Sequence, residues 1–314
     1  VVKGVGRDAF CCADCDTAIS AFDVTNGFTM VFDDKRTVGV TVPKQVAEEI
    51  ARNAEDYSGA PAGSTCHSIL VFALADMPAG IVSKIRPMIG NLGTLPGVTM
   101  PSSHNAGDFG VFLVGAPHVH AITEDDLAKR SDAHMDIDSV GEGAIVIAPV
   151  KVAQAGIIVG DVHAMQGDGE IAGHTTDVSA EVTIQVEVIK KLANDGPILL
   201  PLMENLPPLA RLPSNEELEA ARSIASRSGF DIQTEVAPIQ VVGSGANLNE
   251  ATMNGLERMA KLADMEIDEV RNRVTITGGI EIGRLPGMVH ISMLTPISRL
   301  EQIGIAHLVK EQYG

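Results

Sequence analysis

The period of the hydrophobic pattern divides the chain into a β-rich part and a part with helices. AEVTIQVEVIK (residues 180–190) alternates strictly between apolar and polar residues, which predicts a strand with one face in water. The runs AIVIAPV (144–150) and GIIVG (156–160) are wholly apolar and predict buried strands. Two runs in the first third, FTMVFDD (28–34) and SILVFAL (68–74), also indicate strands.

Helical periodicity dominates the last third of the chain. Residues 214–229 and 249–263 repeat apolar side chains at helical spacing. Ser214 and Glu217 have the spacing of a capping box, which predicts where the first of these helices begins. Further patterns predict a helix at 43–54, a helical turn from Thr123 with Asp126 at the capping-box position, and strands at 238–243 and 288–293.

A proline-rich segment, PILLPLMENLPPLARLPSNEE (197–217), lies where the period changes. We therefore predict a β-rich body at residues 1–205 that carries the functional loops, followed by an α+β lobe at residues 206–314. The expected fold class is mainly β, with a sandwich-like or barrel-like body of mixed short strands.

Composition narrows the classes of function. The chain has 314 residues, of which 41 are acidic and 23 basic, giving a net charge of -18. Such a surface repels phosphate backbones and anionic membranes, so we expect no nucleic-acid partner and no membrane partner. No apolar run approaches the ~20 residues of a membrane span, and no signal peptide is recognisable, so a cytoplasmic location is expected. The CCADC segment (11–15) is interpreted as ordinary reduced cysteines, because its acidic neighbours disfavour a thiolate.

The segment GDVHAMQGDGE (160–170) places many ligand-type side chains on a glycine-rich backbone. Glycines permit tight turns, and binding residues concentrate on loops that strands hold in place. Imidazole and carboxylate groups at this spacing suit Zn²⁺ or another divalent first-row metal. The candidate residues are Asp161, His163, Gln166, Asp168 and Glu170.

A second cluster of the same kind lies upstream, in SDAHMDID (131–138). In an extended backbone, Asp132, His134, Asp136 and Asp138 would all project from one face. Because the two clusters flank a pair of apolar strands, we expect them to converge on one metal ion. The alternative is that both are polar hairpin turns, whose histidines are satisfied by hydrogen bonds.

Several other histidines have a structural explanation at least as good as a functional one. Candidates that would complete or line the site are His104 with Asp108, the pair His118 and His120, and His174. His67 and His290 lie in apolar runs and are expected in the core.

The segment 160–170 resembles the signature of the acetamidase/formamidase family, GD-x-H-x-x-QGDGE. The flanking sequences resemble the neighbouring segments of that family over about residues 131–205, and more weakly to the end. Asp136 matches the aspartate of the family's GNMD-like turn, and His134 stands where that turn usually has asparagine. The family's N-terminal NP-x-TGP-like segment has no clear match, SSHNAGDFG (102–110) being the nearest glycine-rich turn.

The resemblance implies a cytoplasmic hydrolase of short amides that releases ammonia and a carboxylate. It also implies a β-rich body, a bound divalent metal and a homo-oligomer. We therefore expect a small neutral amide as substrate, and a homodimer or homotetramer as the assembly.

Each candidate residue has an expected role in this chemistry. A metal ion lowers the pKa of a bound water, and a nearby carboxylate can move its proton. We expect His163 and Asp136 as metal ligands, with His134 and Asp161 next. Among the catalytic candidates, Glu170 is the general base, Gln166 a donor to the substrate carbonyl, and Asp168 a substitute base.

Two alternatives to amide hydrolysis stay open. Acidic, glycine-rich loops also suit Ca²⁺, which would fit a non-catalytic binding or assembly protein. The two histidines favour Zn²⁺, since Ca²⁺ prefers oxygen ligands. The other alternative is a metal hydrolase of a different C–N bond, such as that of a cyclic amide.

Overall fold

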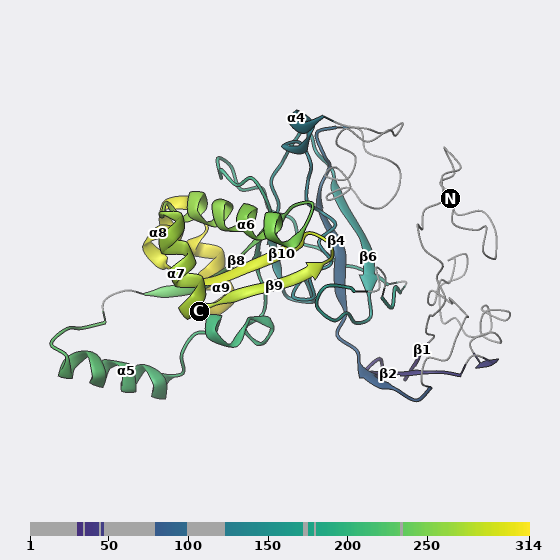
Figure 1. Cartoon of the computed structure of the whole chain (residues 1–314), viewed down its shortest axis with the longest axis horizontal. Coiled ribbons are helices and arrows are strands. Elements are labelled where there is room, and N and C mark those ends of the chain that lie inside the picture. Colours follow the sequence, from purple (N-terminus) through teal and green to yellow (C-terminus); the bar gives the residue numbers. More distant parts are fainter. Residues whose placement is uncertain are drawn as a thin grey trace.

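The computed structural model describes residues 30–33, 35–43, 45–46, 79–98, 123–171, 175–178, 180–232 and 235–314. Its strands form antiparallel sheets of three, five and two strands, and within these described residues no sheet closes into a barrel (Figure 1). The expected mainly β fold, with helices in the last third, is confirmed. Several predictions lie outside the described residues: the strand at 68–74, most of the helix at 43–54, the CCADC segment, SSHNAGDFG, His67, His104, Asp108, His118, His120 and His174.

The three-stranded sheet is set apart from the body of the molecule (Figure 1). It consists of β1 (Met30–Phe32), β2 (Val38–Thr41) and β3 (Val82–Lys84), in that order. The Asp33 carboxylate closes the β1–β2 turn by accepting from the backbone N–H of Thr37 at 2.6 Å and of Val38 at 2.8 Å.

The five-stranded sheet is the central sheet of the body. Its order is β5 (Ile145–Ile147), β7 (Ile198–Leu200), β8 (Val236–Ser244), β10 (Met288–Pro296) and β9 (Gly279–Arg284). The predicted strands at 144–150, 238–243 and 288–293 are confirmed as β5, β8 and β10. The sheet joins strands from both sides of residue 205, and the division into parts 1–205 and 206–314 stays a prediction.

Helices cover one face of this sheet. The predicted helix at 249–263 is confirmed as α6 (Leu248–Ala263), which packs on β8 and β10 beside α7 (Ile267–Thr277). The helices α8 (Ile297–Ile303) and α9 (Ala306–Tyr313) complete this layer. The core between the layers is aliphatic and includes Ile239, Met259, Ile291 and Met293.

The other face of the sheet packs against the layer that carries the candidate site. A smaller apolar cluster joins Met135, Ile137 and Val140 from the upstream loop to Val242 and Met288 of the sheet. This packing buries the loop backbone and fixes the side chains that alternate with its apolar residues.

A two-stranded sheet brings the two predicted clusters together. It pairs β4 (Met88–Thr94) with β6 (Ile157–His163), so the strand expected at 156–160 continues into the glycine-rich segment. The other edge of β4 meets the upstream cluster, because the carbonyl of Gly90 accepts from the N–H of Met135 at 2.9 Å and of Asp136 at 3.0 Å. One strand therefore has a predicted cluster along each edge.

The strand predicted at 180–190 is wrong for this structure. The described residues there form no strand. The exposed fractions of Ile184, Val186 and Val188 are 40%, 58% and 72%. Alternation records which side chains share a face, but it does not specify a pairing partner.

The predicted helix at 214–229 is confirmed as α5 (Asn215–Arg227), with the Ser214–Glu217 capping box. It follows two short 3₁₀ helices, η1 (Met203–Asn205) and η2 (Pro208–Ala210), and projects away from the body (Figure 1). It makes no extensive contact with another described helix or strand.

The short helix α4 (Glu124–Leu127) has Thr123 as its N-cap and the predicted capping box to Asp126. In the part of the chain that the structure describes, no helix has the length and apolar character needed to cross a bilayer.

Candidate metal centre and active site

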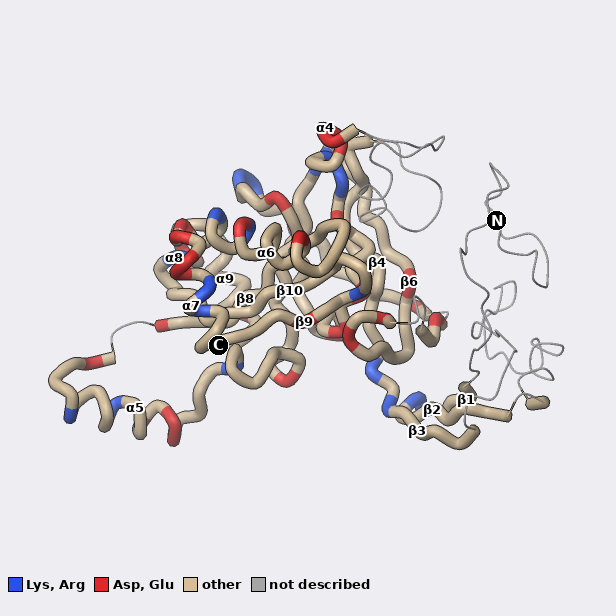
Figure 2. The backbone as a smooth tube through the Cα atoms, in the orientation of Figure 1, with Lys and Arg blue, Asp and Glu red and all other residues tan. Residues whose placement is uncertain are grey.

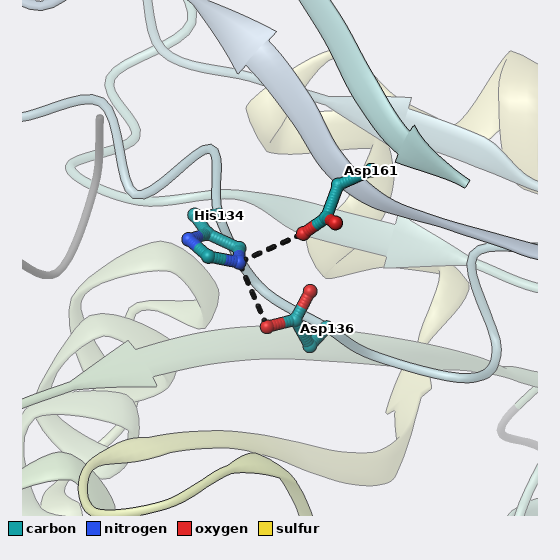
Figure 3. A group of neighbouring side chains, drawn as sticks. All are labelled: His134, Asp136 and Asp161. Carbon is teal, nitrogen blue, oxygen red and sulfur yellow. Dashed lines mark ion pairs between the residues drawn. The ribbon is translucent and has the colours of Figure 1, made fainter. Parts of the chain in front are cut away.

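His134, Asp136 and Asp161 form a compact group of ligand-type atoms (Figure 3). Nε2 of His134 lies 2.9 Å from Oδ2 of Asp136 and 2.9 Å from Oδ2 of Asp161. His134 and Asp136 come from the upstream loop, and Asp161 comes from β6. The two clusters therefore meet, as the sequence predicts.

His163, at the end of β6, belongs to a second group that shares Asp161. Its Nε2 lies 3.3 Å from Oδ1 of Asp161 and 3.4 Å from Oδ1 of Asp177. The two oxygens of Asp161 thus face different histidines. Asp177 was not predicted, and it lies beside His163 because the two residues form an isolated antiparallel β-bridge.

Gly90 of β4 lies directly beneath the group of His134, Asp136 and Asp161. A Cβ atom at this position would overlap Oδ1 of Asp136 and lie 3.0 Å from Oδ2 of Asp161. Oδ1 of Asp136 is buried and has no hydrogen-bond partner among the described residues. A buried carboxylate oxygen without a donor is costly, and a cation would remove that cost.

The backbone at three site residues is held in the left-handed region. The φ angles are 48° at Asp136, 59° at Asp161 and 39° at Glu170. Such angles cost about 1–3 kcal/mol in residues other than glycine and persist where surrounding structure imposes them. Here they turn the side chains toward a common point.

The electrostatics of the group favour a positive charge at its centre. Burial opposes a charged imidazole, but hydrogen bonds to Asp136 and Asp161 outweigh it and raise the pKa of His134 to about 9. For His163, burial is likewise outweighed by Asp161, and the pKa rises to about 9. The two histidines in turn hold the pKa of Asp161 well below its usual range, against the effect of burial.

Glu170 lies beside the group with the properties expected of a proton carrier. Burial and the adjacent negative charge of Asp136 raise the pKa of Glu170 to about 8. A carboxyl group with such a pKa exchanges protons near neutral pH.

Gln166 is a scaffold for the centre in this structure. Its Nε2 donates to the backbone carbonyl of Asp136 and, at 3.0 Å, to that of Gly283. Its Oε1 lies 2.8 Å from Nδ1 of His163. Both amide hydrogens are therefore engaged within the protein, which leaves none for the substrate carbonyl, the role predicted from sequence.

Two other predicted candidates, Asp132 and Asp138, have partners outside the centre. Asp132 binds Arg130 at 2.7 Å and Arg258 at 2.6 Å, and Asp138 pairs with Arg86. The expectation that residues 132, 134, 136 and 138 share one face is wrong, because positive φ angles at Asp132 and Asp136 break the alternation.

Asp168 lies in a separate acidic environment. Burial raises its pKa, and its nearest charged influences are Asp138 and Arg86. Within the GDGE segment, Glu170 thus lies beside the candidate centre, whereas Asp168 lies near Asp138.

Sequence reasoning missed Arg284, at the end of β9. Its Nη1 lies 2.9 Å from Nε2 of His134 and 3.3 Å from Oδ2 of Asp136. The neighbouring backbone is tied to the glycine-rich loop, because the N–H of Leu285 donates to the carbonyl of Gly169 at 3.0 Å. No motif marks this arginine, and only the fold brings it to the site.

The chain belongs to the Acetamidase/Formamidase family, whose model matches residues 12–298. Three solved structures are similar to it. The first is a predicted acetamidase/formamidase from Thermoanaerobacter tengcongensis, with 24% sequence identity, a TM-score of 0.46, and coverage of 72% of this chain and 58% of that chain. The second is an acetamidase from Yersinia enterocolitica, with 19% identity, a TM-score of 0.43, and coverage of 73% of this chain and 58% of that chain. The third is an acetamidase from Bacillus halodurans, with 20% identity, a TM-score of 0.42, and coverage of 71% of this chain and 59% of that chain. The chain spans 58–59% of the length of these three proteins. No curated protein sequence matches it significantly.

Proposed function

We propose that the protein is a metal-dependent hydrolase of short linear amides of the formamide or acetamide type, releasing ammonia and a carboxylate. The observation that carries the proposal is the group of His134, Asp136 and Asp161 over Gly90, with Glu170 beside it. Membership of the Acetamidase/Formamidase family supports the same reaction class.

The donor set fits a divalent ion. The unpartnered oxygen of Asp136 and the space above Gly90 provide a position for it. His134, Asp136 and Asp161 would hold it, and His163 lies at the other oxygen of Asp161. Mixed nitrogen and oxygen ligands suit Zn²⁺. When bound, such an ion lowers the pKa of water and polarises a carbonyl group.

The residues of the chain would then handle the proton and the charge. The carboxylate of Glu170 takes a proton from the attacking water while the new C–O bond forms at the amide carbon. The same carboxyl group delivers the proton to the leaving nitrogen as the C–N bond breaks, so ammonia departs neutral. The Arg284 guanidinium stabilises the negative charge that develops on the carbonyl oxygen.

The function is tested by metal content and ammonia release measured on the same preparation. Purified protein is reconstituted with Zn²⁺ and assayed on formamide, acetamide, propionamide and a cyclic amide. Ammonia release from the linear amides that disappears on chelation and returns with Zn²⁺ supports the proposal. Full metal occupancy without ammonia release from any linear amide would refute the proposal.

The non-catalytic alternative predicts Ca²⁺ in the centre. The imidazoles of His134 and His163 argue against it, because Ca²⁺ prefers an all-oxygen shell. Selective retention of Ca²⁺ over Zn²⁺ by the purified protein, with no hydrolysis of amides, would establish that alternative.

We further propose a homodimer or homotetramer in which α5 packs on a second copy of the chain. An isolated helix of 13 residues is marginal in water. α5 carries charges of both signs and stands away from the body (Figure 2). Its Ile224 is 56% exposed. Leu209, which precedes α5, and Ile276 of α7 are 59% and 71% exposed, so helix and body offer apolar surfaces that a symmetric pair of copies would cover reciprocally.

Light scattering tests the assembly. Ile224→Glu on α5 is expected to shift the protein to a smaller species, whereas Ser223→Glu, one position away, is not. A monomeric parent protein at micromolar concentration would contradict the proposal. A cytoplasmic location also stays a proposal, and it would be checked by fractionating cells that express the full protein.

A further inference from the structure

We propose that the centre holds two divalent ions, with the carboxylate of Asp161 bridging them. One ion would bind His134, Asp136 and Asp161, and the other Asp161, His163 and Asp177. The inference extends the proposed metal-dependent function, but counting ions tests it separately from catalysis.

The two oxygens of Asp161 are already divided between two sets of ligands. Oδ2 lies 2.9 Å from Nε2 of His134, and Oδ1 lies 3.3 Å from Nε2 of His163. Each set has a further carboxylate of its own, from Asp136 or from Asp177. A carboxylate that offers one oxygen to each of two ligand sets is the arrangement found in two-metal hydrolytic sites, where the ions lie about 3.5–4 Å apart.

Hydrogen bonding orients His163 as a ligand through Nε2. Gln166 donates from Nε2 to the carbonyls of Asp136 and Gly283, so its Oε1 faces His163. That oxygen can only accept, so Nδ1 of His163 is the donor in their 2.8 Å contact. The neutral imidazole then presents the lone pair of Nε2 toward Asp161 and Asp177. A metal-binding histidine whose other nitrogen donates to a fixed acceptor has this same arrangement.

The distances in the second group match the spacing of ligand atoms around one ion. Nε2 of His163 lies 3.3 Å from Asp161 Oδ1 and 3.4 Å from Asp177 Oδ1. Two ligand atoms bound at about 2.0–2.1 Å to a tetrahedral Zn²⁺ lie about 3.3–3.4 Å apart.

The two positions differ in their access to water. The side chains of His134 and Asp136 are 5% and 0% exposed, whereas that of Asp177 is 42% exposed. The ion held by His134 should therefore exchange slowly, and the ion held by Asp177 should exchange first.

The test counts ions per chain. Protein stripped with a chelator and reloaded with Zn²⁺ should contain two ions per chain by elemental analysis, and a mild chelator should remove one before the other. Asp177→Asn should retain one ion. The matched control Asp195→Asn, which removes a surface carboxylate paired with Lys261, should retain two. Thermal melting of both variants establishes that they are folded.

A second measurement reports the bridge itself. In protein loaded with Mn²⁺, two ions joined by Asp161 should give the electron paramagnetic resonance spectrum of a coupled pair, and Asp177→Asn should give that of a single ion. One ion per chain at saturation would overturn the inference, and if that protein still released ammonia the proposed function would stand. Two ions in Asp177→Asn would also overturn it. The absence of any bound ion would remove both proposals.

Discussion

Nε2 of His134 lies 2.9 Å from Oδ2 of Asp161, although one residue belongs to a loop beside β4 and the other to β6 on the opposite edge of that strand. This contact joins the two ligand-rich segments of the chain across one strand. The chemistry expected of the centre depends on it, and the predictions below test the residues around it.

Replacing His134 should remove metal and activity together. His134→Ala deletes a buried nitrogen ligand, so Asp136 and Asp161 lose the imidazole that lies 2.9 Å from each of them. Elemental analysis should show at least one ion fewer per chain, and ammonia release should fall by about 10²-fold or more. His307→Ala, an exposed histidine of α9, serves as the control. Full metal content in His134→Ala would exclude His134 as a ligand.

Glu170→Gln should separate catalysis from metal binding. The amide keeps the shape of the side chain but cannot accept the proton of the attacking water. We expect kcat to fall by about 10²-fold or more with the metal content unchanged. The control is Glu142→Gln, at an exposed position outside the centre. Loss of metal in Glu170→Gln would make Glu170 a ligand, and an unchanged kcat would move the base elsewhere, with Asp168 the next candidate to test.

Arg284→Gln should weaken stabilisation of the reacting carbonyl oxygen. Its guanidinium is in contact with Asp136 and His134, and we expect it to contact the carbonyl oxygen of a substrate bound at the centre. Loss of one such donor typically lowers kcat by about 10²–10³-fold. The matched control is Arg273→Gln, which breaks a surface ion pair on α7. Equal effects of the two substitutions on kcat would rule out the role for Arg284.

Asp132→Asn should destabilise the fold without touching the centre directly. Burial alone would raise the pKa of Asp132, but Arg258 and Arg130 outweigh it and lower the pKa to about 2. A buried arginine left without its partner costs about 3–5 kcal/mol. Urea unfolding near neutral pH should show this loss. Because the folded pKa lies below the usual value of 3.8, the stabilisation should disappear in the parent protein as the pH falls from about 4 to about 2.

Glu281 should give the opposite pH dependence. Burial, Asp168 and Asp138 raise its pKa to about 7 from a usual value of 4.5. The folded state therefore holds a proton that the unfolded state has released, so stability should fall as the pH rises from about 4.5 to about 7 and then level off. The charged or titratable groups around it are His290, Asp168, Asp138, Arg86 and Arg211.

The variant Glu281→Gln isolates this contribution. It should flatten the pH dependence by about 1–3 kcal/mol between pH 5 and pH 7, measured as free energies of unfolding in urea. Glu301→Gln, on the surface of α8, should leave the slope as in the parent protein. A Glu281→Gln variant with the parent slope would show that Glu281 ionises as an ordinary exposed carboxyl group.

Much of the fold could be predicted because its signals are local. The helices α5 and α6 and the strands β5, β6, β8 and β10 follow from apolar periodicity and from capping residues such as Ser214. The failure at 180–190 shows the limit of such signals, since a strand also needs a neighbour that supplies hydrogen bonds.

The ligand-type residues of the centre could be predicted from the sequence, because histidine and aspartate cluster in two short segments. His134, Asp136, Asp161 and His163 stand in unusual local sequences, and the fold brings them together. The contribution of Arg284 was not predictable, because it depends on where β9 ends relative to the glycine-rich loop. The departures of Asp132 and Asp138 likewise arise from left-handed backbone angles at Asp132 and Asp136, which are uncommon outside glycine and are not marked by the apolar pattern.

Gly90 bears on how relatives of this chain should be recognised. A methyl group at residue 90 would lie against Asp136 and Asp161, where the proposed cation would bind. A homologue with alanine there could preserve every residue of the 160–170 signature and still have no room for the ion. A search that scores only the ligands would count such a protein as an amidase. Residue 90 should therefore be read together with the signature before an activity is assigned to any new sequence.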